Sequence, residues 1–304
     1  SRSGRPRILG LRTMFVAKDY INGGWRFRNK ENGRESGFET GFRIGAPSQV
    51  HTFGFYAGKL RAAHPELFNA GRLNAVGKPC QTLCLSDETT RAFVAEEIGR
   101  TIEADRAKRK GVPLSEMPNI YELSQDDGGS EQECMCENCR RAYEAAGKRY
   151  SAPMIAFVSA VADRVHRKYP EVRIRTLAYS YTDLPPQNDV RASKNVIVRY
   201  CRSHFLSPNE LVPGSENGKL LEEWRQHASY FSIWSYWRSY SGKLFPAVLT
   251  RTRLGAELRF CAEAGAVEYF AENENPMSHA FAMLHHWLFL KLADDPDQDV
   301  MALS

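Results

Sequence analysis

Two kinds of pattern alternate along this chain, and their alternation constrains the fold more than any other feature. Short runs rich in β-branched and aromatic residues are typical of strands, and stretches with apolar residues at the three- and four-residue spacing of helices separate them. The candidate strands are residues 8–16, 50–56, 80–86, 119–125, 173–181, 195–200, 230–237 and 266–272. Strands that alternate with helices predict an α/β fold with a parallel sheet.

The candidate helices carry recognisable start and stop signals. In residues 87–111, Asp87 or Thr89 can cap the first turn, and Gly111 lies past the end. Eight strands, each followed by a helix or a long loop, in 304 residues match a single (β/α)8 TIM barrel. No low-complexity linker or fixed-period repeat divides the chain, so we expect one domain over residues 1–304.

Charge and hydropathy argue against two classes of partner. The formal net charge of +5 is small for 304 residues, and the basic residues are scattered among acids, so nucleic acid is not an expected partner. No window holds the roughly 18 consecutive apolar residues of a membrane span, so none is predicted. The 13 Tyr, 16 Phe and 5 Trp residues, several of them at predicted strand ends, favour a ligand with flat apolar faces, such as a sugar ring.

Paired carboxylates follow the fourth predicted strand. In a barrel the chemistry lies at the carboxyl ends of the strands, and this strand ends in Asp126 and Asp127, followed by two glycines. Adjacent aspartates point in different directions, so one can orient a substrate while the other transfers a proton. We prefer Asp127 as the acid, because the glycines after it let a substrate approach closely. A turn without catalytic function is the alternative, since all four residues favour turns.

A second group of carboxylates ends the eighth predicted strand. Period-two alternation places Glu268, Phe270 and Glu272 on one face. Across a barrel, Glu272 or Glu274 would face the aspartates of the fourth strand, which is the arrangement that two-carboxylate sugar hydrolysis needs. We assign Glu272 as a candidate base or nucleophile and Glu274 as a candidate substrate contact. Solvated loop carboxylates are the alternative.

Aromatic and polar side chains end the fifth, sixth and seventh predicted strands. One aromatic strand end is usually core packing, but three neighbouring ones favour a platform on which a sugar stacks. The candidate substrate-binding residues from these strands are Tyr179, Tyr181, Arg199, His204, Trp234, Tyr236 and Trp237.

Three closely spaced cysteines indicate a metal site next to the aspartates. Cys134, Cys136 and Cys139 offer three thiolates within six residues, and structural zinc takes four tetrahedral ligands. Cys84, at the end of the third predicted strand, is the expected fourth ligand, and Cys80 is the second choice. A local disulfide and free thiols are the alternatives. No histidine lies beside the motif, so no nucleophilic role is assigned, and no cofactor is expected for catalysis.

Several motifs in a fixed order resemble one bacterial protein family. They are HPELF, CQTLCLSD, SQDDGG with CMCENC, TLAYSYTDLPP, NVIVRYC, SIWSYW and HHWLFLKLADDPDQDV, from about residue 48 to the end. Together they resemble the domain of unknown function family 4838. That family is similar to barrels of the glycoside hydrolase clan, including α-glucuronidases and β-N-acetylhexosaminidases, so the resemblance implies a carbohydrate substrate.

The resemblance also implies a location and a mechanism. Members of the family often occur as exported proteins with a further domain ahead of the barrel, so we expect a periplasmic or extracellular location and a trimmed catalytic domain. Hexosaminidases similar to this family end their fourth strand in paired acids. By that resemblance, Asp126 steadies an acetamido group that attacks the sugar carbon, while Asp127 protonates the leaving oxygen.

The sequence therefore predicts a glycoside hydrolase. Asp127 is the expected general acid, enclosed by aromatic side chains, with Asp126 as its orienting partner and Glu272 as base or nucleophile. One alternative is a carbohydrate-binding barrel that has lost activity, which would keep the aromatic platform without a productive carboxylate pair. The other is a metal-dependent hydrolase that uses the cysteine loop.

Overall fold

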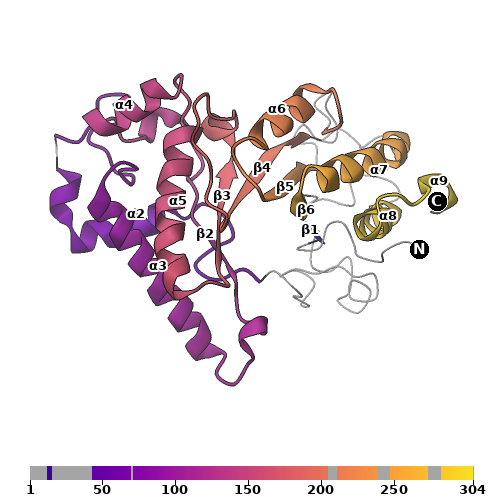
Figure 1. Ribbon diagram of the computed structural model, residues 1–304, viewed down its shortest axis with the longest axis horizontal. Helices are drawn as coiled ribbons and strands as arrows, with labels where there is room; N and C mark the ends of the chain where they lie inside the picture. Colours follow the sequence, from indigo (N-terminus) through magenta and orange to yellow (C-terminus); the bar gives the residue numbers. More distant parts are fainter. Residues whose placement is uncertain are drawn as a thin grey trace. The chain divides into compact units, whose positions relative to one another are not determined.

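The computed structural model describes residues 12–15, 43–69, 71–204, 211–237, 247–272 and 282–303 (Figure 1). Six strands form one sheet in the order β1–β6–β5–β4–β3–β2. Their bounds are β1 Arg12–Phe15, β2 Ile120–Glu122, β3 Arg173–Ala178, β4 Val196–His204, β5 Phe231–Tyr236 and β6 Ala266–Glu272. The pairs β1–β6, β5–β6 and β2–β3 are parallel, which confirms the predicted α/β class.

The predicted eight-stranded TIM barrel is wrong. In the described part of the chain the sheet has six strands, and its strand order runs from β1 at one end to β2 at the other without closing. Six of the predicted strands overlap these six, but residues 50–56 and 80–86 form no strand. The two missing strands are the ones that would have lain between β1 and β2 in a closed barrel.

The predicted strand at residues 50–56 is the beginning of a helix, α2, which runs over Phe53–Ala63. The amides of Thr52 and Phe53 both donate to the carbonyl of Ser124, at 3.1 and 3.0 Å, and these bonds place the helix start beside the end of β2. The buried side chains of α2 follow helical spacing and are Phe53, Tyr56, Ala57 and Leu60. A short apolar run fits both the two-residue period of a strand and the 3.6-residue period of a helix. Only the spacing of apolar residues over a longer stretch distinguishes a helix from a strand.

The predicted strand at residues 80–86 is a loop. Its apolar side chains Leu83, Cys84 and Leu85 are buried, as a strand would require, yet no ladder forms. The loop instead packs against the segment that bears the other cysteines, where the Thr82 hydroxyl donates to the carbonyl of Gln132 at 3.1 Å. Its burial therefore comes from packing on that segment and not from sheet pairing.

The described chain divides into two compact units, which are taken separately below. One unit comprises residues 44–199 and 223–229. The other comprises the described residues of 1–43, 200–222 and 230–304. The expectation that residues 1–304 form one domain stays a prediction.

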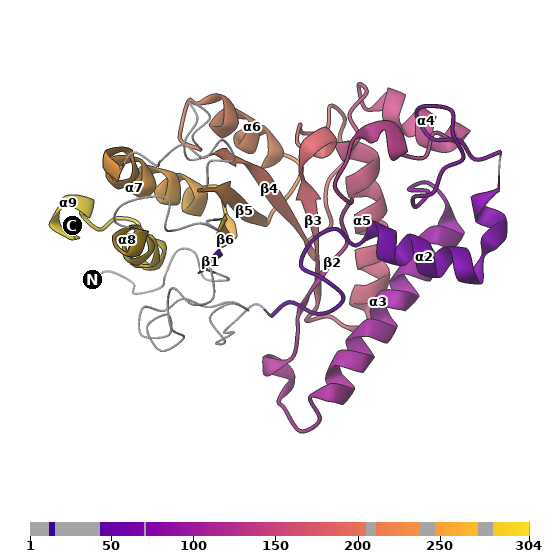
Figure 2. The same cartoon turned by 180° about the vertical axis from the view of Figure 1, so that it is seen from behind.

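The first unit holds β2, β3 and the helices α2, α3 (Glu88–Lys108), α4 (Glu137–Ala145) and α5 (Ser151–Lys168). α3 and α5 pack side by side, and α5 also packs on β3 (Figures 1 and 2). As predicted, Asp87 caps α3, since its Oδ1 accepts from the amide of Thr90 at 2.6 Å. Short 3-10 turns cover Pro65–Phe68, Leu114–Glu116, Ser130–Gln132 and Ser180–Thr182.

The second unit holds β1, β5, β6 and the helices α7 (Ala247–Glu263), α8 (Ala282–Asp294) and α9 (Val300–Leu303). α7 packs on β6 and α8, and α8 packs on β1. Helix α6 (Glu216–Trp224) and strand β4 each contain residues of both units. Among the described helices of the whole chain, none combines the length and hydropathy that spanning a membrane needs.

Candidate functional site

Carboxylates and tyrosines gather at the carboxyl ends of β2 and β3. Asp126 and Asp127 follow β2, and Tyr179 and Tyr181 follow β3. The Tyr179 hydroxyl donates to Asp127 Oδ1 at 3.1 Å, and the Tyr181 hydroxyl donates to Glu133 Oε1 at 2.5 Å. Together with His51, whose Nε2 lies 3.5 Å from Asp127 Oδ1, these residues form what we call the carboxylate site. Parallel strands bring their carboxyl ends to one edge, so two sequence segments meet here.

The two neighbouring aspartates have different surroundings. Asp126 is half-buried, and burial raises the pKa of its carboxyl, with the charge of Asp127 acting in the same direction. A hydrogen bond from the Gly54 amide and the proximity of His51 oppose that rise. Asp127, by contrast, has a side chain that is 73% exposed, so the expected enclosure by aromatic residues is not found around it.

Gly54 lets the Asp126 carboxylate approach the first turn of α2. A Cβ added at Gly54 would lie 2.9 Å from Asp126 Oδ2, closer than real Cβ contacts allow. Helix N-termini present unpaired amides and a partial positive charge, which suit a carboxylate. A backbone without a side chain at this position therefore gives Asp126 its place.

Glu133 is a third carboxylate that the sequence did not single out. Its side chain is buried, with 3% of the residue exposed. Burial raises the pKa of Glu133 to about 7, against the hydrogen bond from Tyr181, and the charges of Cys80 and Asp126 add to the rise. Glu133 directly precedes Cys134, so it lies on the same loop as both the aspartates and the cysteines.

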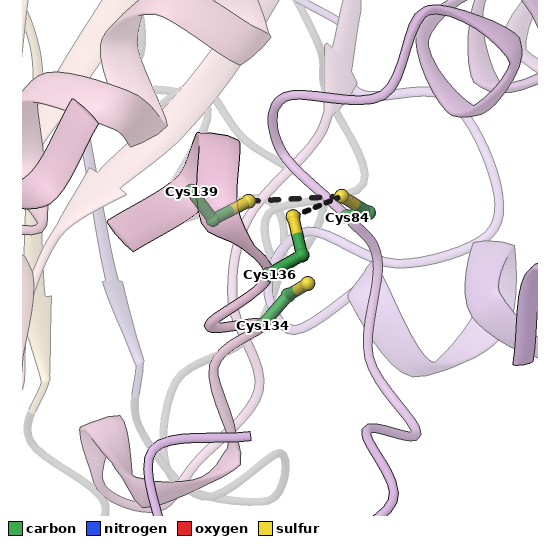
Figure 3. Close-up of side chains that lie close together, drawn as sticks. All are labelled: Cys84, Cys134, Cys136 and Cys139. Atoms are coloured by element: carbon green, nitrogen blue, oxygen red, sulfur yellow. Dashed lines mark hydrogen bonds between the residues drawn. The ribbon is translucent and has the colours of Figure 1, made fainter. Parts of the chain in front are cut away.

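Four cysteine sulfurs converge beside this loop, as Figure 3 shows, and form what we call the cysteine cluster: Cys84, Cys134, Cys136 and Cys139. All four sulfurs lie within 4.8 Å of one another. Cys84 Sγ is 3.7 Å from Cys136 Sγ and 3.6 Å from Cys139 Sγ. Four sulfurs around a zinc ion at about 2.3 Å each would be about 3.8 Å apart. The cluster is therefore the four-ligand set that the sequence predicted, and a metal ion fits it.

The local chain explains why the four thiols meet. Cys136 is the residue before α4 and Cys139 lies in its first turn, where the helix dipole favours thiolates. The amide of Met135 donates to the carbonyl of Leu73 at 2.9 Å, which fixes the loop to the segment that leads to Cys84. Hydrogen bonds from neighbouring thiols lower the pKa of Cys84. A surface pocket of about 450 Å³, with Cys84 and Cys136 in its lining, gives the cluster access to solvent.

The remaining candidate carboxylate, Glu272, lies in the other unit. It is at the end of β6, with 7% of the residue exposed, and its Oε2 accepts from Trp234 Nε1 at 2.8 Å. Trp234 lies 6.3 Å from Tyr236 between ring centroids. Trp237 is buried and packs on Phe289, with ring centroids 5.5 Å apart. The structure thus brings Glu272, Trp234 and Tyr236 together, while Trp237 contributes to the core.

Three predicted substrate contacts remain. Arg199 is fully buried within β4. His204 is the last residue of β4, and its side chain lies outside the described part of the chain. Glu274 also falls outside the described residues.

Fold and site together define an α/β protein in which one segment, residues 126–139, carries the three acids of the carboxylate site and three of the four cysteines of the cluster. The chain belongs to the family described as Domain of unknown function (DUF4838), whose model matches residues 8–304. This confirms the family resemblance of the sequence motifs. No curated protein matches the sequence.

Proposed function

We propose that the protein hydrolyses a glycosidic bond at the carboxylate site. The observation that carries the proposal is the Asp126–Asp127 pair, whose two carboxyls lie in different surroundings at the carboxyl ends of parallel strands. Pairs of acids that differ in this way are typical of sites where one group binds or donates and the other exchanges a proton with the substrate. The tyrosines beside the pair are side chains on which a sugar can stack or to which it can hydrogen-bond.

Asp127 is the proposed general acid, because it is exposed to an incoming substrate and is held at one oxygen by Tyr179. Asp126 is the proposed orienting residue. The group that attacks the sugar carbon is either an acetamido group of the substrate, steadied by Asp126, or a second carboxylate.

The first prediction is that the protein cleaves one class of aryl glycoside and that Asp127→Asn removes this activity. A panel that includes N-acetylhexosaminides and uronides would be assayed with both proteins. Loss of a general acid typically costs about 10²- to 10⁴-fold in rate. Glu131→Gln is the matched control, since Glu131 is an exposed carboxylate on the same loop, and it should keep wild-type activity.

Turnover that survives in Asp127→Asn would contradict the assignment of the acid. Binding of a sugar without turnover of any glycoside, measured by calorimetry, would contradict the hydrolase and favour the carbohydrate-binding alternative.

We also propose that the cysteine cluster holds a structural zinc ion. Four sulfur ligands complete a tetrahedral shell and leave no open position for a water molecule, so the metal would stabilise the loop without taking part in hydrolysis. The pocket beside Cys84 and Cys136 provides the entry path that such a site needs.

The second prediction is one equivalent of zinc per chain by elemental analysis. Cys139→Ser should lose the zinc and lower the melting temperature, because binding free energy of the metal is folding free energy. Cys80→Ser is the matched control: Cys80 is buried next to Cys134 but lies outside the cluster of four. Zinc loss in Cys80→Ser equal to that in Cys139→Ser would contradict the ligand set.

A further inference from the structure

His51 is held over the end of β2 in an unusual backbone conformation. Its φ of 57° lies in the left-handed region, which is uncommon for residues other than glycine. The amide of His51 donates to Ser124 Oγ at 3.1 Å, and the amides of the next two residues donate to the Ser124 carbonyl. Strained residues of this kind gather at functional sites, where the surrounding structure enforces them.

The ring of His51 has a defined proton on one nitrogen. Nδ1 lies 2.8 Å from the carbonyl oxygen of Gln125, and a carbonyl oxygen only accepts hydrogen bonds, so Nδ1 carries a proton. Nε2 then faces Asp127 Oδ1 at 3.5 Å. This separation is that of an ion pair, which forms when Nε2 also carries a proton and Asp127 is ionised.

The two oxygens of Asp127 have different partners. Oδ1 accepts from the Tyr179 hydroxyl at 3.1 Å and faces His51, whereas Oδ2 has no hydrogen-bond partner among the described residues. The titratable groups that face the His51 ring are Asp127, Asp126, whose charge interacts with the ring, and Tyr179, whose ring centroid is 6.1 Å away. Oδ1 is thus held on two sides, while Oδ2 has no partner in the described part of the chain and belongs to a side chain that is 73% exposed.

We propose that His51 is a positioning residue that shares one proton with Asp127, holding Oδ1 in place and leaving Oδ2 for the substrate. This role rests on the proposed hydrolysis, because the proton that Asp127 gives to a leaving group is then replaced through His51. Before this step Nε2 carries the proton shared with Oδ1, and Oδ2 carries a proton of its own. Asp127 gives the Oδ2 proton to the leaving oxygen while the shared proton passes from Nε2 to Oδ1. The site has then lost one proton and His51 is neutral, until water returns a proton to Nε2.

Nitrogen NMR of the ring tests the shared proton without any substrate. In the ¹⁵N-labelled wild type we expect the His51 Nδ1 signal of a protonated nitrogen and an Nε2 signal displaced toward protonated nitrogen. In Asp127→Asn the Nε2 signal should move toward an unprotonated nitrogen, and in Glu131→Gln it should stay as in the wild type. An Nε2 signal that is the same in wild type and Asp127→Asn would overturn the proposal.

Chemical rescue tests the role in catalysis. Glycine suits the positive φ of residue 51, so His51→Gly removes the ring with little backbone cost. We expect kcat to fall by at least about tenfold with little change in KM, and imidazole in the buffer to restore part of kcat. Imidazole should not rescue Asp127→Asn.

The two tests separate the two proposals. A wild type that cleaves no glycoside in the panel would contradict the hydrolase, while the NMR result would still decide whether the proton is shared. A wild type that is active, with full kcat retained in His51→Gly, would overturn the role of His51 and leave the hydrolase in place.

Discussion

At the scale of single residues, two adjacent aspartates differ in their surroundings. Asp126 lies half-buried against the first turn of α2, and Asp127 lies exposed beside Tyr179 and His51. Burial makes the protonated form of Asp126 easier to keep than in an ordinary aspartate, as its raised pKa shows.

The third prediction concerns the pH dependence of stability. Because the pKa of Asp126 is raised in the folded protein, folding is favoured at low pH and loses this contribution as pH rises from the ordinary value of 3.8 through the higher folded value. Asp126→Asn cannot ionise, so its melting temperature should fall less than that of the wild type over this window. It should also be higher than the wild-type value at pH 7. Thermal unfolding across pH measures both.

Asp189→Asn is the control for that measurement, because the Asp189 side chain is exposed. Equal pH dependence in Asp126→Asn and the wild type would show that Asp126 is not the group that couples folding to protons.

The sequence predicted site residues where their types form an unusual pattern at a strand end. The Asp126–Asp127 pair and the tyrosines after β3 were predicted from strand ends, and the structure brings Tyr179 and Asp127 into contact. His51 and Glu133 were missed. His51 lay inside a segment interpreted as a strand, and Glu133 is one acid among several on its loop. Only the folded structure shows that the His51 amide donates to Ser124 and that the Glu133 carboxylate accepts from Tyr181.

At the scale of elements, α2 serves the site through the backbone of its first turn. Its buried face packs into the unit through Phe53, Tyr56 and Leu60, and this packing sets where its free amides lie. The Gly54 amide then reaches the Asp126 carboxylate. A helix that was interpreted as a strand thus supplies part of the site.

The fourth prediction separates the two glycines of this helix. In Gly58→Ala the new methyl group meets nothing within 4 Å, so the substitution should stabilise the protein by about 1 kcal/mol through helix propensity and leave activity unchanged. In Gly54→Ala the Cβ would lie 2.9 Å from Asp126 Oδ2, so the carboxylate must move. We expect a smaller gain in stability and a loss of turnover. Denaturant unfolding and the glycoside assay compare the pair, and equal behaviour of the two variants would contradict this account.

At the scale of the whole molecule, the alternation of patterns predicted the class of fold and not its closure. Six of the eight expected strands overlap observed ones, since their hydrophobic runs are long enough to be buried in a parallel sheet. Closure depended on residues 50–56 and 80–86, where apolar side chains are buried by helix packing and by the cysteine-bearing loop. The periodicity of apolar residues indicates which side chains are buried. It does not indicate which element of the fold buries them.

The fourth ligand of the cysteine cluster was predicted correctly, but from an incorrect secondary structure. Cys84 was chosen as the fourth ligand because adjacent strand ends would place it beside the loop after the fourth strand. No strand forms there in the described chain, yet Cys84 Sγ lies 3.6 Å from Cys139 Sγ. The residue was predicted correctly through an element that does not exist, because residues 80–86 pack on the cysteine-bearing segment whether or not they form a strand.

The short stretch that joins the aspartates to the cysteines has a consequence for how the protein matures in a cell. Residues 126–139 carry Asp126, Asp127 and Glu133 together with three of the four thiols. With zinc as the proposed occupant, the supply of that ion during synthesis would set the fraction of molecules that leave the ribosome with an ordered site. Cultures grown in zinc-poor medium would then yield the same amount of polypeptide, with a smaller fraction of molecules in which residues 126–139 are ordered.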